Sequence, residues 1–209
     1  MTKKQTQILT ILAILAALAY SSWPLGYLLN PVVGSNGLAS ELEAVNQPYN
    51  WVFVAGDVLS SLLIAAVAIV IWRRKPRHDN STFLFMAAIV SFALLTVADT
   101  LLPLHCNPSL AACPDYTHDP LLFLHGIFSI LASNGLFISV LIVWWHKRSS
   151  PIMNGIMVGY LLFGLVSLFN ILQPGHGTWS QHFYLTLCSV WIALIPYGAR
   201  QLHNHRGKH

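Results

Sequence analysis

Six apolar runs, each long enough to cross a lipid bilayer, follow one another along this chain. They cover residues 7–29, 50–72, 82–104, 120–145, 151–172 and 181–199. A helix needs about 20 apolar residues to cross the hydrocarbon core of a bilayer. Charged residues make up only 9% of the 209 positions, against roughly 25% in an ordinary soluble domain. We therefore predict an all-α fold, a bundle of six transmembrane helices that forms a single integral membrane domain over residues 1–209.

The basic residues predict how this bundle is oriented. All eleven Lys and Arg fall at one set of span ends, and six of the seven Asp and Glu lie toward the other. Because short cytoplasmic loops are enriched in Lys and Arg, we expect both termini to be cytoplasmic and the protein to lie in the plasma membrane. This bias also explains the formal net charge of +4. Nucleic acid is not predicted as a partner, since no soluble portion presents a basic face.

The first apolar run has a second interpretation. Lys3 and Lys4 precede an apolar stretch that ends in small residues at 17–19, which is also the pattern of a cleavable signal peptide. Cleavage would leave five spans. The orientation of those five would not change, because the downstream basic clusters still determine it. The sequence leaves both interpretations open.

Ionisable side chains inside the spans form the clearest functional signal. Counted from the predicted outer side, Asp57 lies seven residues into the second span, His125 five into the fourth, and Asp99 five from the end of the third. At about 1.5 Å per residue, the three form one layer roughly 8–10 Å below the outer interface. Such groups are costly in lipid, so we expect them to face a protein interior or a wet cavity. We assign five candidate binding residues to this outward-facing site: Glu41, Ser61, His105, Ser129 and His182.

Two aspartates with several histidines also indicate metal chemistry. Asp99, His118 and His125 are candidate ligands for a divalent ion such as zinc, and Asp57 and Asp99 are candidate catalytic carboxylates. This set predicts a metal-assisted hydrolase that acts on a lipid or lipid-linked substrate in the outer leaflet. Two features count against it. The sequence has no HExxH pattern, and seven residues separate His118 from His125.

Two other functions fit the same residues. In a non-catalytic binding or assembly protein, Asp57, Asp99 and His125 would form a buried hydrogen-bonded network that ties the helices together. In a transporter of a proton or small solute, the carboxylates would lie on a path through the bilayer. The inner halves of the spans count against such a path, because they are almost wholly apolar apart from Ser91, Ser139 and a few glycines.

Two cysteines occupy the outer loop between the third and fourth spans. Cys106 and Cys113 would lie in a compartment that permits disulfides. We therefore predict a bridge that closes a small loop over the polar layer.

The residues around this loop resemble a known family. The motifs are Ser40-Glu41-Leu42-Glu43-Ala44, Gln47-Pro48, Trp51 and Gly56-Asp57, then Ala98-Asp99, Pro103, Cys106, Pro108-Ser109, Cys113, His118, His125 and Ser129. Because of these motifs, the chain resembles the family of prokaryotic six-span membrane proteins called domain of unknown function 998. The resemblance covers nearly the whole chain. The resemblance implies that the acidic residues, the cysteine pair and the histidines belong to one family pattern, but it implies no activity. His105 departs from the pattern, which leads us to expect an acidic residue before the first cysteine.

Overall fold

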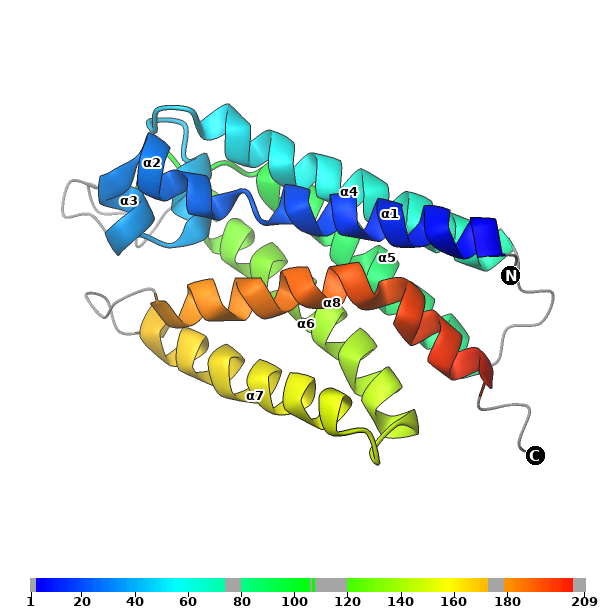
Figure 1. Ribbon diagram of the computed structural model, residues 1–209. Coiled ribbons are helices and arrows are strands. Elements are labelled where there is room, and N and C mark those ends of the chain that lie inside the picture. The colour runs from blue at the N-terminus through cyan, green and yellow to red at the C-terminus, as the bar shows by residue number, and fades with distance from the viewer. Residues whose placement is uncertain (1–2, 74–79, 106, 108–119, 173–178, 205–209) are drawn as a thin grey trace.

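The computed structural model describes residues 3–73, 80–105, 107, 120–172 and 179–204 (Figure 1). In these residues, six segments are helical, long and apolar enough to cross a membrane. They consist of α1 (Lys3–Tyr20) with its continuation to Leu29, α4 (Asn50–Arg73), α5 (Asn80–Thr100), α6 (Pro120–His146), α7 (Pro151–Leu172) and α8 (Trp179–Asn204). The predicted all-α bundle of six candidate spans is confirmed.

The two ends of the bundle differ in character. The start of α1 and the end of α8 lie at one end, and the short helices α2 (Gly26–Leu29) and α3 (Pro31–Asn36) lie at the other (Figure 1). We call these the basic end and the cap end. The described basic side chains fall at the basic end, namely Lys4, Arg73, Lys147, Arg148 and Arg200. Between the two ends, α1 packs against α4 and α8, α5 packs against α4 and α6, and α7 packs against α8.

The first span is broken, whereas the sequence predicted one helix over 7–29. α1 ends at Tyr20, and the chain turns at residues 21–22 before it enters a short 3-10 helix, η1 (Trp23–Leu25). Pro24 explains the break. A proline has no N–H to donate to the carbonyl four residues earlier, here that of Tyr20, and its ring clashes with that carbonyl.

Two other helices, α5 and α8, differ from the predicted spans. α5 ends at Thr100, not at residue 104, because the residue before Pro103 is disfavoured in a helical conformation. α8 extends from Trp179 to Asn204, beyond the predicted 181–199 at both ends. Both differences lie outside the apolar centres of the spans, so the order and number of spans are unchanged.

An apolar core fills the half of the bundle nearer the basic end. Its largest fully buried side chains include Trp191, Tyr160, Phe85, Phe92 and Leu136. The polar groups inside this core bond to each other: Trp191 Nε1 donates to Ser139 Oγ at 2.7 Å, and Ser139 Oγ donates to the Leu136 carbonyl at 2.6 Å. The inner half is therefore closely packed and internally satisfied.

A close helix crossing fixes α6 against α5. A Cβ atom at Gly135 would lie 3.1 Å from both the Ala88 carbonyl oxygen and the Phe92 backbone nitrogen, so only glycine allows this approach without a shift. The crossing brings the outer halves of the two helices together. Asp99 on α5 and Ser129 on α6 thereby come into contact.

Residues 37–47 cross the cap end and include a second 3-10 helix, η2 (Ala39–Glu43). We call residues 37–47 the cap segment. The Ala39 N–H donates to Gln181 Oε1 of α8 at 2.9 Å, and the Val45 N–H donates to the Leu104 carbonyl at 2.9 Å. Asn107 Nδ2 adds a bond to the Glu41 carbonyl at 2.9 Å. These contacts hold the cap segment between α8 and the chain that follows α5.

Candidate functional site

A cavity of about 350 Å³ lies where the cap segment meets the outer halves of the helices. Its volume falls within the range of roughly 300–1,000 Å³ that is typical of ligand pockets. The polar lining comes from five different elements, and its main members are Glu43, Asp57, Asp99, Ser129, Ser133 and Gln181. Side chains far apart in the sequence therefore share one space.

The cavity changes from polar to apolar with depth. On α5 its lining runs from Asp99 to Phe92, seven residues and about 10 Å of helix. On α6 it runs from Ser129 to Phe137, about 12 Å. The carboxyl groups therefore lie toward the cap end, while Phe92, Phe137 and Leu161 line the deeper part.

One side of the cavity reaches the outer surface of the bundle. The lining residues Ile130, Leu161 and Leu165 are 54%, 46% and 65% exposed, although they also face the cavity. They lie on α6 and α7, which meet at the basic end and spread apart toward the cap end (Figure 1). We call this opening the α6–α7 seam. In a bilayer the seam would face lipid.

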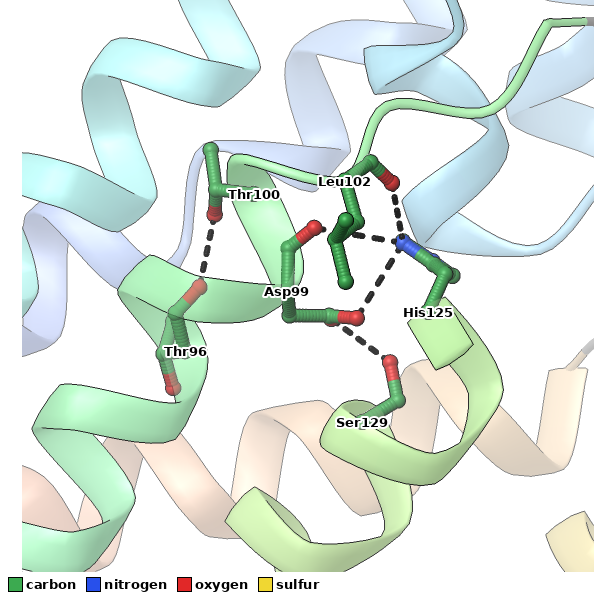
Figure 2. Close-up of polar contacts among 6 residues, drawn as sticks. All are labelled: Thr96, Asp99, Thr100, Leu102, His125 and Ser129. Atoms are coloured by element: carbon green, nitrogen blue, oxygen red, sulfur yellow. Dashed lines mark hydrogen bonds and ion pairs between the residues drawn. The ribbon is translucent and has the colours of Figure 1, made fainter. Parts of the chain in front are cut away.

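Asp99 is held by two residues of α6 (Figure 2). Ser129 Oγ donates to Asp99 Oδ2 at 2.6 Å. His125 Nδ1 lies 3.1 Å from Asp99 Oδ1 and 3.0 Å from the Leu102 carbonyl oxygen. Because only oxygen acceptors surround Nδ1, this nitrogen carries a proton. His125 and Ser129 are one turn apart on the same helix face, so both reach the same carboxylate.

The second ring nitrogen of His125 is also informative. His125 is 5% exposed, and its Nε2 atom has no hydrogen-bond partner among the described residues. In many metal sites, a carboxylate or carbonyl holds one ring nitrogen of a histidine, and the other nitrogen binds the metal. His125 has the same arrangement, with Nδ1 held and Nε2 without a described partner.

Glu43 of the cap segment meets Asp57 of α4 across the cavity. The two carboxyl groups are hydrogen-bonded to each other. Burial raises the pKa of Glu43 well above its usual value of 4.5, and the negative charges of Asp57 and Asp99 raise this pKa further. The raised pKa favours the protonated form of Glu43, which donates its O–H to Asp57.

An aromatic cluster closes the cavity beside α8. The Trp23 ring stacks on the His182 ring with centroids 4.5 Å apart, and the Tyr27 hydroxyl lies 2.8 Å from His182 Nδ1.

Trp23 and Ser167 both line the cavity. Trp23 Nε1 and Ser167 Oγ are buried atoms without a hydrogen-bond partner among the described residues. Buried polar groups normally have partners, so these two are available to a ligand.

The structure brings together part of the predicted site. Asp57, Asp99 and Ser129 line the cavity, His125 contacts Asp99, and His182 supports the lining residue Trp23. The predicted layer of intramembrane polar groups therefore converges on one space.

Four of the five predicted binding residues do not line this space: His182 packs on the lining residue Trp23, and the other three lie elsewhere. Glu41 is buried within the cap segment, Ser61 is buried on α4, and His105 is exposed after α5. On α4 the cavity lining ends at Asp57, one turn before Ser61, and in η2 it includes Ser40 and Glu43 but not Glu41.

Other predictions concern positions outside the described residues. His118, Cys106 and Cys113 all lie there, so the third metal ligand and the disulfide stay predictions. Within the described ranges, no three His, Cys, Asp or Glu side chains gather in a way that could hold a metal ion. Asp99 and His125 contact each other, and their role as metal ligands stays a prediction.

The sequence prediction missed Glu43, Trp23 and Ser167 as cavity residues. Glu43 follows Glu41 by two positions, and the sequence offers no signal for which of the two turns inward, because η2 is not a regular α-helix. The position of Trp23 depends on the break after α1, for which Pro24 was the available signal.

These observations define a polytopic membrane protein with an acidic, laterally open site among its helices. Residues 11–199 match the family described as Protein of unknown function (DUF998). The chain belongs to this family, and the resemblance drawn from its motifs is confirmed. Neither the comparison with curated proteins nor that with solved structures finds a match. The family carries no assigned activity, so function has to be argued from the site.

Proposed function

We propose that the protein binds an amphipathic lipid or lipid-linked molecule inside the membrane. The polar head would lie at Glu43, Asp57 and Asp99, and the chain would extend through the α6–α7 seam. The observation that carries the proposal is the lateral exposure of apolar residues that also line the cavity, since a water-soluble ligand has no need of a lipid-facing opening. The change from polar to apolar lining with depth supports the same kind of ligand.

The charge distribution supports a site in the outer leaflet. We infer that the basic end is cytoplasmic, because Lys and Arg gather there, and that the cap end faces outward. Exposed tryptophans flank both ends of the bundle, with Trp51 and Trp179 toward the cap end and Trp72 and Trp145 toward the basic end. Such rings prefer the two membrane interfaces. The cavity would then open to the outer half of the bilayer.

A matched pair of glycine substitutions tests the proposal. Gly164 lines the cavity, and a Cβ there would lie 3.4 Å from the Tyr184 ring, so the Cβ of Gly164→Leu fits and the rest of the side chain narrows the cavity. Gly155 lies on the same helix with nothing within 4 Å of its Cβ position, so Gly155→Leu is the control. The protein is purified in a bulky neutral detergent and titrated with twelve-carbon amphiphiles that have cationic, neutral or anionic heads.

We expect at least one amphiphile to raise the Tm in a saturable way. A ligand at 100 times its Kd stabilises the folded state by about 2.7 kcal/mol, which corresponds to roughly 5–10 °C for a chain of this size. The rise should be lost in Gly164→Leu and kept in Gly155→Leu. If no amphiphile raises the Tm, or if Gly164→Leu responds like the unaltered protein, the proposed site is wrong.

A second candidate function is hydrolysis of the bound molecule. The orientation of His125, with Nδ1 held and Nε2 available, favours it, since a metal at Nε2 would supply Lewis-acid chemistry beside Asp99. Elemental analysis of the purified protein tests this function. We expect stoichiometric zinc or another divalent ion that is lost in His125→Ala. Protein that retains lipid binding but contains no metal would contradict it.

Transport gains no support from the structure. The predicted path needed polar groups below Asp57 and Asp99. Ser139 is engaged by Trp191, and Ser91 lies on the exposed surface of α5. The cavity lining does not extend to either residue.

A further inference from the structure

We propose that the head group recognised in this cavity is a cation, a protonated or quaternary amine carried on a long apolar chain. This inference rests on the proposed function and names its ligand class. Three features of the cavity lead to it: its charge, its aromatic lining and its unsatisfied polar groups.

The charge of the lining is acidic. Glu43, Asp57 and Asp99 face the cavity, and no Lys or Arg lies among its lining residues. The described Lys and Arg lie at the other end of the bundle. Among the described residues, His125 is the one basic side chain in contact with these carboxyls, and of the three it contacts Asp99. Glu43 and Asp57 contact each other rather than a described Lys or Arg, so the lining is acidic without a described cation to balance it. A buried charge is costly unless it is paired, and a cationic ligand would pair it.

Aromatic rings line the same cavity as the carboxyls. Tyr20, Trp23, Phe53, Phe92 and Tyr184 all line the cavity. The face of an aromatic ring attracts an ammonium group, and sets of such rings beside a carboxylate bind quaternary ammonium ligands in other proteins. An anionic head such as a phosphate would instead meet repulsion from the carboxylates, with no described basic lining residue to offset it.

Two unsatisfied groups indicate what lies next to the cation. Ser167 is 6% exposed and its Oγ atom faces the cavity without a partner among the described residues. Trp23 also lines the cavity, and its Nε1 is a buried donor that likewise has no partner among the described residues. A donor requires an acceptor, so we infer that the ligand carries an oxygen acceptor, such as a hydroxyl, ether or ester, between its amine and its chain.

The test compares heads on a constant chain. The full-length protein in a bulky neutral detergent is titrated with dodecyltrimethylammonium, glycerol monododecyl ether and dodecyl phosphate, and with tetramethylammonium, which has no chain. Thermal shift gives the Kd of each probe. We expect dodecyltrimethylammonium to bind about tenfold or more tightly than the other three probes. Asp57→Asn should reduce this preference to about twofold or less.

Each outcome separates the two proposals. If the neutral or anionic amphiphile binds as tightly as the cationic one, the proposal of a cationic head group is wrong, although the cavity still binds amphiphiles. If tetramethylammonium alone binds as tightly as the twelve-carbon cation, the cationic head group is supported and the proposal of an apolar chain is wrong. If no probe binds, both proposals fail. The comparison of heads uses the unaltered protein, so it gives a decision even if Asp57→Asn does not fold.

Discussion

Ser129→Ala offers a direct measurement of the charge on Asp99. Ser129 Oγ donates to Asp99 Oδ2 at 2.6 Å, a short distance typical of a bond to an ionised carboxylate. A hydrogen bond to a charged group contributes about 1.5–3 kcal/mol, against about 0.5–1.5 kcal/mol for a neutral pair. For a chain of 209 residues, the charged case predicts a fall in Tm of about 3–12 °C.

The assay is thermal unfolding in neutral detergent, followed by tryptophan fluorescence. A double-mutant cycle with Asp99→Ala isolates the contribution of the pair, because alanine leaves no acceptor for Ser129. The matched control is Ser139→Ala with Trp191→Phe, because Ser139 lies on the same helix and accepts a bond from the Trp191 ring at 2.7 Å, with no charge involved. We expect a coupling energy of about 1.5–3 kcal/mol for the first pair and about 0.5–1.5 kcal/mol for the second. Equal coupling energies would refute an ionised Asp99 and remove half of the charge argument for a cationic ligand.

Two further predictions concern pH and covalent state. The pKa of Glu43 is higher in the folded protein than in the unfolded chain, where it is about 4.5. Above that pH the folded protein keeps a proton that the unfolded chain has released. The free energy of unfolding should therefore fall as pH rises from about 4.5 through the folded-state pKa. Glu43→Gln should flatten this fall, measured as Tm against pH, and an unchanged slope would contradict the buried proton. The intact mass of purified protein should equal that of the whole chain less two hydrogens. The first span should be kept because its removal would strip the core of Leu9, and the two hydrogens would be lost in the expected Cys106–Cys113 bridge. A mass lower by about twenty residues would show that the first span is cleaved.

The sequence allowed the fold to be predicted because each span is marked by its own composition. Apolar length, basic residues and prolines are local signals, and none depends on which helices touch. The break after α1 was missed even though Pro24 marks it. The span was predicted from the apolar character of the whole run 7–29, and a single turn within the run changes that average very little. The depth of Asp57, Asp99 and His125 was predictable for a similar reason, since helical rise converts residue number into height.

The composition of the cavity could not be predicted in the same way. Ser61 lies one turn beyond Asp57 on the same helix face and was assigned to the site for that reason, but the sequence does not show how deep the cavity extends, and its lining on α4 ends at Asp57. Glu43 depends on how the cap segment is held by Gln181 and Leu104, which are distant in the sequence. Contacts between distant segments decide both cases, and no local pattern encodes them.

The proposed ligand would meet two parts of the chain that differ in how freely they can change. Glu43 and Ser40 line the cavity from a short stretch that does not cross the bilayer, whereas the apolar lining on the lipid-facing side comes from α6 and α7. Within residues 37–47 the side chains of Glu41, Leu42 and Ala44 are buried, so substitutions at positions 40 and 43 would alter head-group preference with the least effect on packing. Relatives that bind different molecules should therefore diverge first at these two positions.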